Sequence, residues 1–299
     1  MQQQALASRI GPVGVWHGGL GRVSAATARR AAAEIERLGY GALWFGEGPG
    51  TEAVSRAAVL LAATARMTVA TGIANIWVRD AAAAKAAAHT LAEAYDGRFL
   101  LGLGASHAPL VDRRGHTYAK PLTAVREYLD AMDAAPYDGP DGPAPARVLA
   151  ALGPKMLELA RDRAAGAHPY FVTPEHTARA RAALGTGPLL APEQAVLLES
   201  DPAKARSLAR EHHTRFYLQL PNYTGSLRRL GFGDEDFADG GSDRLVDAIV
   251  AWGDVDAVRR RVREHHEAGA DHVAVQPVAA GRELGLDQLR ELAPALIQA

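Results

Sequence analysis

The sequence predicts an α/β fold, a (β/α)₈ barrel of the TIM type with one insertion between strands 7 and 8. Short apolar runs alternate with longer amphipathic segments along the chain, which is the pattern of parallel strands joined by helices. Eight such runs can be counted, and eight strands close a barrel. The 299 residues, 48% of them hydrophobic, suit one barrel with a well-buried core. We therefore expect a single domain over residues 1–299.

The expected strands are runs of aliphatic and β-branched residues bounded by turn-forming residues. In chain order they span 12–16, 42–47, 67–75, 98–104, 147–152, 167–172, 188–198 and 272–278. In a parallel barrel the carboxyl ends of all strands meet at one face, and ligands bind there. Residues at these strand ends are therefore the first candidates for function.

Between the strands, apolar residues recur every three or four positions, which predicts helices. Ser24 is a typical N-cap residue, Thr173 and Asp201 each precede a proline at the first helical position, and Gly39 follows a last turn. The expected helices span 24–38, 52–65, 81–95, 121–134, 155–163, 174–184, 202–213 and 255–268.

Two segments do not fit the repeat. Residues 135–146 hold four prolines and two glycines, which predicts a surface loop. Residues 214–250 contain an aromatic and proline cluster at 216–223, an acidic glycine-rich loop at 231–241 and an expected helix at 243–252. An insertion between strands 7 and 8 lies beside the barrel mouth, so this segment is a candidate lid.

Composition excludes several classes of function. The net charge of −1 leaves no basic stripe for nucleic acid or an anionic membrane. No apolar run approaches the roughly 18 residues of a membrane span, and residues 1–10 do not resemble a signal peptide, so we expect a cytoplasmic protein. There is no cysteine, and the pairs His212-His213 and His265-His266 point to different helix faces, so no metal site is expected.

Several stretches resemble the luciferase-like flavin-dependent oxidoreductases, the luciferase-like monooxygenase family. The resemblance covers nearly the whole chain and is carried by residues 39–47, 70–73, 98–106 and 152–155. Residues 73–77 through 106–110 are most similar to the actinobacterial branch that uses coenzyme F420, a deazaflavin. The resemblance implies that F420 binds at the barrel mouth, with FMN as the alternative cofactor.

Within that family, Gly72 and Ile73 match a bulge with a non-prolyl cis peptide that supports the ring of the cofactor. The alternative interpretation is an ordinary strand end with a small residue. Asn75 could hydrogen-bond the pyrimidine edge of the ring, or it could be a turn residue.

Small residues and a helix start provide further cofactor candidates. Gly104, Ala105 and Ser106 end the fourth strand with little side-chain bulk, so a cofactor could lie close to the backbone. Gly153, Pro154 and Lys155 open a helix whose free N–H groups suit a phosphate. Lys155 could add charge or could simply be solvated.

Three residues are candidates for proton transfer because each lies at or just past a strand end: Glu47, His107 and His17. Glu47 matches the position where relatives place an acidic residue against the ring, and burial would favour its protonated form. Some F420-dependent relatives carry Asp-His at this point, whereas this chain reads Glu47-Gly48. Their histidine acid is absent, so His107 or His17 could replace it, although a loop histidine is often only a packing residue.

Aromatic residues near the mouth suggest an apolar or planar substrate. The substrate-binding candidates are Trp77, Tyr170, Phe216, Asn222 and Tyr223, the last three in the insertion. His168 and Thr173 lie near the mouth as well, although Thr173 is equally explained as a helix cap.

The sequence thus predicts an oxidoreductase that transfers hydride between F420 and a small organic substrate, and relatives suggest a homodimer. The alternatives are an FMN-dependent monooxygenase of the same family and a barrel that binds cofactor without catalysis. A metal hydrolase is a more distant possibility.

Overall fold

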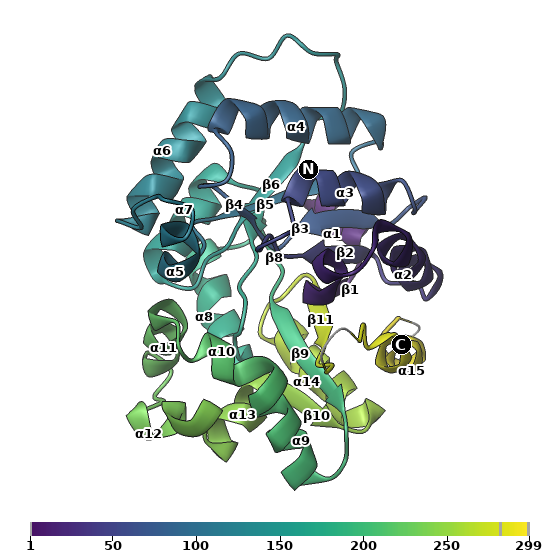
Figure 1. Cartoon of the computed structure of the whole chain (residues 1–299), viewed down its shortest axis with the longest axis vertical. Coiled ribbons are helices and arrows are strands. Elements are labelled where there is room, and N and C mark those ends of the chain that lie inside the picture. Colours follow the sequence, from purple (N-terminus) through teal and green to yellow (C-terminus); the bar gives the residue numbers. More distant parts are fainter. Residues whose placement is uncertain (1, 281–282, 298–299) are drawn as a thin grey trace.

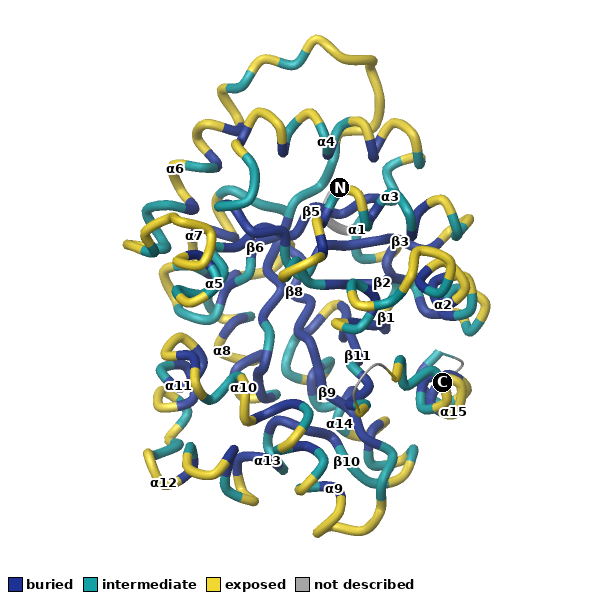
Figure 2. Tube along the Cα trace, viewed as in Figure 1, coloured by how far each residue is buried: buried dark blue, intermediate teal, exposed yellow. Residues whose placement is uncertain are grey.

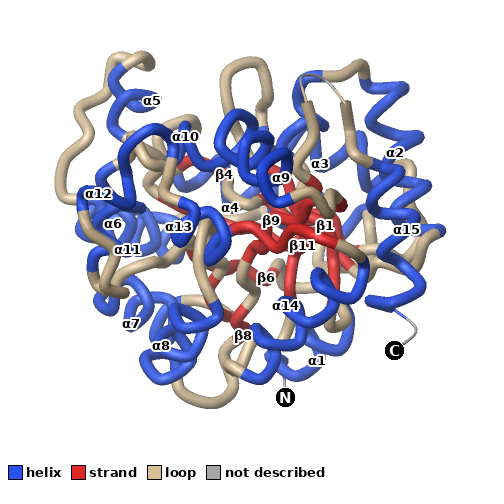
Figure 3. Tube along the Cα trace, turned by 90° about the horizontal axis from the view of Figure 1, so that it is seen from below, coloured by secondary structure: helices blue, strands red, loops and turns tan. Residues whose placement is uncertain are grey.

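A computed structural model describes residues 2–280 and 283–297, in which eleven strands form one sheet. The strands pair in the order β10-β9-β11-β1-β2-β3-β5-β6-β7-β8, with β4 paired to β5, and the pairings between them are parallel. Helices surround the strands (Figures 1 and 3). The strands are β1 Val13–Trp16, β2 Ala42–Phe45, β3 Thr68–Thr71, β4 Ala74–Asn75, β5 Phe99–Gly104, β6 Ala146–Leu149, β7 Gly166–Ala167, β8 Leu189–Leu190, β9 Glu193–Leu198, β10 Val250–Gly253 and β11 Val273–Pro277.

The barrel closes through the segment that carries β8 and β9. β8 pairs with β7, and β9 pairs with β11, so this segment joins the two ends of the sheet. The N–H groups of Ala191 and Glu193 continue the pairing by donating to the carbonyls of Ala167 and Pro169. The intervening Pro192 has no N–H to donate. The expected (β/α)₈ barrel of the TIM type is confirmed, and residues 188–198 supply its seventh strand.

The helices pack their apolar faces against the outside of the barrel, and their other faces are exposed (Figure 2). Ser24, Thr173 and Asp201 cap their helices as expected, each accepting a hydrogen bond from a backbone N–H. The helices are α1 Gln2–Ile10, α2 Ala25–Arg37, α3 Ala53–Leu61, α4 Ala81–Ala94, α5 Ala108–Asp112, α6 Pro121–Ala134, α7 Pro154–Arg163, α8 Pro174–Leu184, α9 Pro202–Ala209, α10 Arg215–Tyr217, α11 Pro221–Arg228, α12 Asp234–Phe237, α13 Asp243–Ile249, α14 Val255–Glu267 and α15 Leu286–Ile297.

Several expected elements differ in extent from the observed ones. The strand at 67–75 is divided into β3 and β4, and the strand at 167–172 is only the two-residue β7. The helix at 202–213 ends at Ala209 and continues as a π-helical turn, Arg210–Thr214. The helix at 243–252 ends at Ile249, and the following residues form β10. Because β7 is so short, the edge of β9 from Ala195 onward is open, and β10 pairs with it there.

The insertion after β9 forms α10 to α13 and packs beside β9 and β10 (Figure 1). Its apolar side chains share a core with those two strands, separate from the cluster inside the barrel. Residues 136–145 form no helix or strand, as the prolines predicted. In the part of the chain that the structure describes, no helix is long and apolar enough to cross a membrane.

Candidate active site

A pocket of about 450 Å³ lies at the carboxyl ends of the barrel strands. It is reached by segments that follow β2, β3, β5 and β6, and by the insertion. Its volume and mainly apolar lining are typical of a site for an organic ligand. The lining residues are Trp16, Gly46, Glu47, Gly72, Ile73, Ala105, Ser106, His107, Leu110, Tyr118, Pro121, Ala150, Ala151, Leu152, Gly153, Met156, His168, Tyr170, Phe216, Tyr217, Asn222, Tyr223 and Arg229.

One side of the pocket is bare backbone at Gly72 and Ile73. The peptide bond between them is cis, as the family resemblance implied. The indole Nε1 of Trp16 donates to the Gly72 carbonyl at 3.1 Å. A Cβ at position 72 would lie 2.6 Å from that Nε1 and 2.8 Å from Nε2 of His168, so only glycine leaves both rings in place. We call Gly72, Ile73, Trp16 and His168 the pocket floor.

The end of β5 contributes Ala105 and Ser106 to the pocket, but not Gly104. A Cβ at Gly104 would lie 2.9 Å from Cγ1 of Ile73 and 3.0 Å from Cβ of Ala150. Gly104 therefore makes room for the Ile73 side chain rather than for a ligand. Ser106 has a positive φ of 59°, which is uncommon for a residue with a side chain and often found at functional sites.

Glu47 lines the pocket, and its carboxylate group contacts several hydrogen-bond donors. Its side chain is 1% exposed and is ion-paired with Arg79. Its carboxylate also accepts the N–H groups of Ala53 at 2.9 Å and Asn75 at 2.7 Å. Every partner is a donor, so the arrangement suits a carboxylate that accepts hydrogen bonds. Burial lowers the pKa of Arg79, but its hydrogen bond and charge interaction with Glu47 outweigh this, so that pKa is raised.

His17 lies outside the pocket lining and both of its ring nitrogens bind backbone groups. Nδ1 accepts the N–H of Gly19 at 3.0 Å, so Nε2 carries the proton and donates to the Leu284 carbonyl at 2.7 Å. Burial lowers the pKa of His17. The His17 ring thus bonds to two backbone groups and is not brought together with Glu47 and His107 in the pocket.

His107 lies in the pocket with one free nitrogen. Its Nδ1 is buried and has no hydrogen-bond partner among the described residues. Burial lowers the pKa of His107, and its contact with Asn222 acts in the opposite direction. The ring lies 5.5 Å from that of Tyr223, so a histidine that follows β5 meets the insertion.

Asn75 and Trp77 hold loops together beside the pocket. Oδ1 of Asn75 accepts the N–H of Trp77 at 3.0 Å, so Asn75 has the role of a turn residue. The indole of Trp77 donates to the Ala105 carbonyl at 3.0 Å. Asn75 lines a neighbouring cavity of about 250 Å³, together with Arg113 and Arg114. Neither Asn75 nor Trp77 lines the main pocket.

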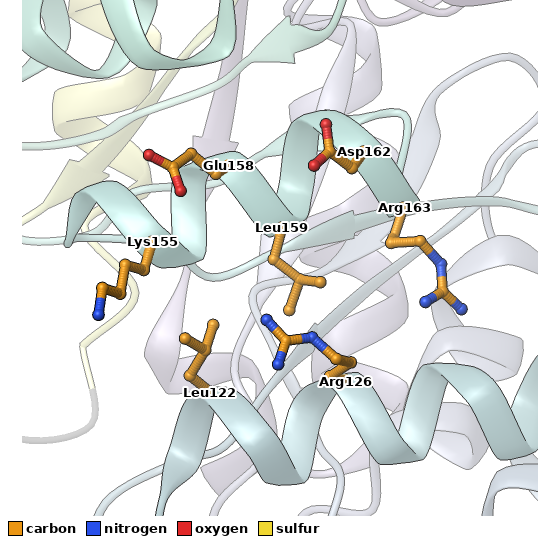
Figure 4. A pocket seen from close by; sticks show the side chains of 7 residues that line it. All are labelled: Leu122, Arg126, Lys155, Glu158, Leu159, Asp162 and Arg163. Carbon is orange, nitrogen blue, oxygen red and sulfur yellow. The ribbon is translucent and has the colours of Figure 1, made fainter.

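The helix start at Gly153 reaches the pocket, whereas Lys155 does not. Gly153 is the N-cap of α7 and Pro154 occupies the first turn. Lys155 lines a separate groove of about 560 Å³ between α6 and α7 (Figure 4). The nearby cation is instead Arg229, which the sequence did not single out, with Nη2 3.9 Å from where a Gly153 Cβ would be. Nothing in its sequence context marks it.

Aromatic side chains from the segment after β7 and from the insertion form the opposite wall. Tyr170 lies in the pocket with its hydroxyl 2.7 Å from that of Tyr217 and 2.8 Å from Oε1 of Gln276. Tyr223 lines the same wall, and Phe216, 55% exposed, lies at the rim. Burial raises the pKa of both Tyr170 and Tyr223 well above 10, so both hydroxyls keep their protons, and Tyr170 donates its proton to Oε1 of Gln276. The lining residues that no sequence pattern indicated include Tyr118, Leu110 and Met156.

In residues 2–280 and 283–297, no group of three or more histidine, aspartate or glutamate side chains is arranged to hold a metal ion. The pocket therefore presents aromatic rings, hydroxyls, bare backbone and, from His107 and His168, imidazole nitrogens that bond to no described residue. These groups can bind and orient an organic molecule.

Comparison with known proteins identifies a matching family and a related protein. A model of the family described as luciferase-like monooxygenase matches residues 12–272. A Mycobacterium tuberculosis protein whose name places it among coenzyme F420-dependent oxidoreductases is 26% identical, over 87% of this chain and 92% of that protein.

Two solved structures share the fold at low identity. One is an F420-dependent secondary alcohol dehydrogenase in complex with an F420-acetone adduct, with a TM-score of 0.76, 17% identity and coverage of 95% of this chain and 98% of that chain. The other is the oxygenating constituent of a Pseudomonas putida 3,6-diketocamphane monooxygenase in complex with FMN, with a TM-score of 0.71, 16% identity and 96% coverage of each chain.

Proposed function

Because this chain belongs to the luciferase-like monooxygenase family, we propose that it is an oxidoreductase that uses coenzyme F420 to transfer hydride to or from a small organic substrate. Similarity to the M. tuberculosis protein and to the alcohol dehydrogenase that holds an F420-acetone adduct supports F420 as the cofactor. The observation that carries the proposal is the pocket at the strand ends, with its bare floor at Gly72 and Ile73.

The residues present fit a flat ring with a phosphate-bearing tail. A Cβ at Gly72 would meet Trp16 and His168, so only glycine leaves the floor as it is. The unpartnered nitrogens of His107 and His168 offer hydrogen bonds to a bound molecule. The positive end of the α7 dipole at Gly153 and the N–H donors of the Arg229 guanidinium suit a phosphate. When bound, F420 supplies or accepts the hydride at its ring.

The chain itself would orient the substrate and exclude water. Phe216, Tyr217 and Tyr223 of the insertion form an aromatic wall of the pocket, which suits an apolar or planar substrate. The Tyr223 hydroxyl can donate a hydrogen bond to a substrate oxygen. We propose that the 214–250 insertion acts as the lid of this pocket.

A second candidate is an FMN-dependent monooxygenase. The FMN-bound Pseudomonas structure shares the fold over nearly the whole chain, which favours keeping this alternative. The two candidates need different cofactors in the same pocket.

The test is a fluorescence titration of the purified protein with F420 and with FMN. Saturable quenching by F420 at low micromolar concentration, with much weaker binding of FMN, is the expected result. Turnover is then assayed with reduced F420 and a panel of ketones, enones and imines. Tight binding of FMN alone would favour the monooxygenase, and binding of neither would refute the proposal.

A pair of variants shows whether the quenching comes from this pocket. Gly72→Ala places a methyl group against Trp16 and His168, so we expect F420 binding to weaken by about tenfold or more. Gly225→Ala is the matched control, because a Cβ there meets nothing within 4 Å. Equal binding by both variants would place the cofactor elsewhere.

A further inference from the structure

We propose that His168 is a positioning residue whose Nε2 atom accepts a hydrogen bond from an N–H or O–H group of the molecule bound over the pocket floor. This inference rests on the proposed function and goes beyond it, because it states that one side chain accepts a hydrogen bond from the ligand and does not donate one.

The proton of the His168 ring is located by its backbone partner. Nδ1 lies 2.6 Å from the carbonyl oxygen of Ala191. A carbonyl oxygen only accepts hydrogen bonds, so Nδ1 carries the hydrogen and Nε2 presents a lone pair. Ala191 is itself held by its N–H bond to the Ala167 carbonyl at 3.0 Å, in the segment that closes the barrel.

The Nε2 atom lacks the partner that a buried nitrogen needs. The residue is 1% exposed, and among the described residues nothing forms a hydrogen bond with Nε2. Buried polar atoms are almost always hydrogen-bonded, and an unsatisfied one destabilises the fold. Because His168 lines the pocket, a bound molecule can supply the missing donor.

The His168 ring is held in an orientation in which Nε2 faces Gly72. It stacks on Trp44 with centroids 4.3 Å apart and an interplanar angle of 13°. Trp44 in turn donates from Nε1 to Nε2 of His272 at 3.1 Å, and Nδ1 of His272 is 2.7 Å from the Gly11 carbonyl. Because Nε2 would lie 2.8 Å from a Cβ at position 72, it points to the backbone of the bulge.

In this arrangement Nε2 of His168 can accept a hydrogen bond but cannot donate one. Burial lowers the pKa of the ring to about 4, so Nε2 carries no proton near neutral pH. His168 therefore cannot act as the acid that protonates a substrate. It can orient a molecule that carries a donor, either an N–H on the cofactor ring or the hydroxyl of an alcohol substrate, and it disfavours a lone pair at the same place.

His266 provides a matched control within the chain. Its Nδ1 lies 3.0 Å from the Ala270 carbonyl, and its Nε2 is buried without a partner among the described residues. It thus has the same bonding pattern as His168 but lies on α14, outside the pocket lining. A general effect of removing a buried imidazole would appear in both.

The experiment records long-range ¹H–¹⁵N spectra of the histidine rings in the wild-type protein, without cofactor and with saturating F420. We expect the resonance of the unprotonated Nε2 of His168 to shift on ligand addition, while that of the Nε2 of His266 does not. A shift with F420 alone assigns the donor to the cofactor. A shift only after 2-propanol is added to the F420 complex assigns it to the substrate.

Two outcomes would overturn the inference. One is an Nε2 resonance that moves with neither ligand although fluorescence shows that F420 binds, in which case the proposed function survives. The other is a ligand-free resonance that already has the value of a hydrogen-bonded nitrogen and does not change, which would identify a water as the partner. If F420 does not bind at all, the proposed function fails and this inference fails with it.

Variants provide a second readout. His168→Phe keeps the stack on Trp44 and removes the acceptor, so the affinity for the molecule that carries the donor should fall about tenfold. His168→Gln retains an acceptor oxygen and should recover part of that loss. His266→Phe should leave the affinity unchanged, and an equal loss in both phenylalanine variants would point to a structural role alone.

Discussion

At the level of single residues, Glu47 and His17 show why a residue's position at a strand end does not determine its chemistry. Both follow strands of the barrel, β1 and β2, as expected. The partners that decide their roles, Arg79 for Glu47 and the Leu284 carbonyl for His17, are distant in sequence. No local pattern could reveal these contacts, because they depend on how the loops fold over each other. For the same reason the sequence suggested Lys155 as the cation of a phosphate site and did not indicate Arg229, which the folded insertion brings to the pocket.

Arg229 and Lys155 yield a direct test of the phosphate position. We expect Arg229→Gln to weaken F420 binding about tenfold, because a charged hydrogen bond to phosphate would be lost beside Gly153. Lys155→Gln should have no effect on affinity, because Lys155 lies in the groove between α6 and α7. Fluorescence titration measures both dissociation constants.

Ionic strength separates this effect from a change in the fold. The loss caused by Arg229→Gln should shrink at high salt, because salt screens the interaction in the wild-type protein. If Lys155→Gln were the weaker binder, the phosphate would lie at the position that the sequence first suggested.

At the level of elements, the sequence predicted best where an element carries its own boundary signals. α6 and α8 begin and end as expected, because prolines fix their first turns. The division of 67–75 into β3 and β4 could not be read from hydrophobicity, because Thr68 to Asn75 is buried at nearly every position. The cis bond between these strands was expected only through the family resemblance. β10 was missed because its pairing depends on how short β7 is.

The insertion is held together by one buried carboxylate, Asp236, whose side chain is 5% exposed. It accepts hydrogen bonds from the N–H of Gly233 at 3.0 Å and the hydroxyl of Ser242 at 2.6 Å, and it pairs with Arg244. The hydrogen bond from Arg244 and that from Ser242 lower its pKa to about 2. The carboxylate is therefore charged under ordinary conditions and joins α12 to the start of α13.

We expect Asp236→Asn to accelerate amide hydrogen exchange in residues 233–249 by roughly tenfold, while exchange in the barrel strands is unchanged. The loss of charge weakens the pair with Arg244. Asp234→Asn is the control, because Asp234 is 85% exposed and its pair with Arg228 lies in solvent. Exchange that rises throughout the barrel would show that the insertion and the barrel unfold as one unit.

At the level of the whole molecule, the fold buries several histidines in their neutral form. Burial lowers the pKa of His168 and His272 to about 4, and that of His213 and His265 to about 3. In the unfolded chain a histidine titrates near 6.5. Between these values the unfolded state binds more protons than the folded state, so stability falls as the pH decreases.

We therefore expect the urea midpoint to fall markedly between pH 7.5 and pH 5.5. Each histidine contributes up to about 1.4 kcal/mol per pH unit below its unfolded pKa. Glu193 acts in the opposite direction, because burial raises its pKa to about 8 and the folded state then holds the extra proton. Over this pH range it offsets about two of the four histidines, so the net effect is still a loss of stability. A midpoint that stays constant or rises on acidification would contradict this account.

The pocket is lined partly by the ends of the barrel strands and partly by the insertion, and this has an evolutionary consequence. Phe216, Tyr217, Asn222, Tyr223 and Arg229 reach it from the insertion, whose core is shared with β9 and β10 and is separate from the cluster inside the barrel. Mutations there can reshape one side of the cavity while Trp16 and His168 keep their places beside Gly72. Sister proteins with the same barrel can thus come to accept different molecules through changes confined to this one stretch of chain.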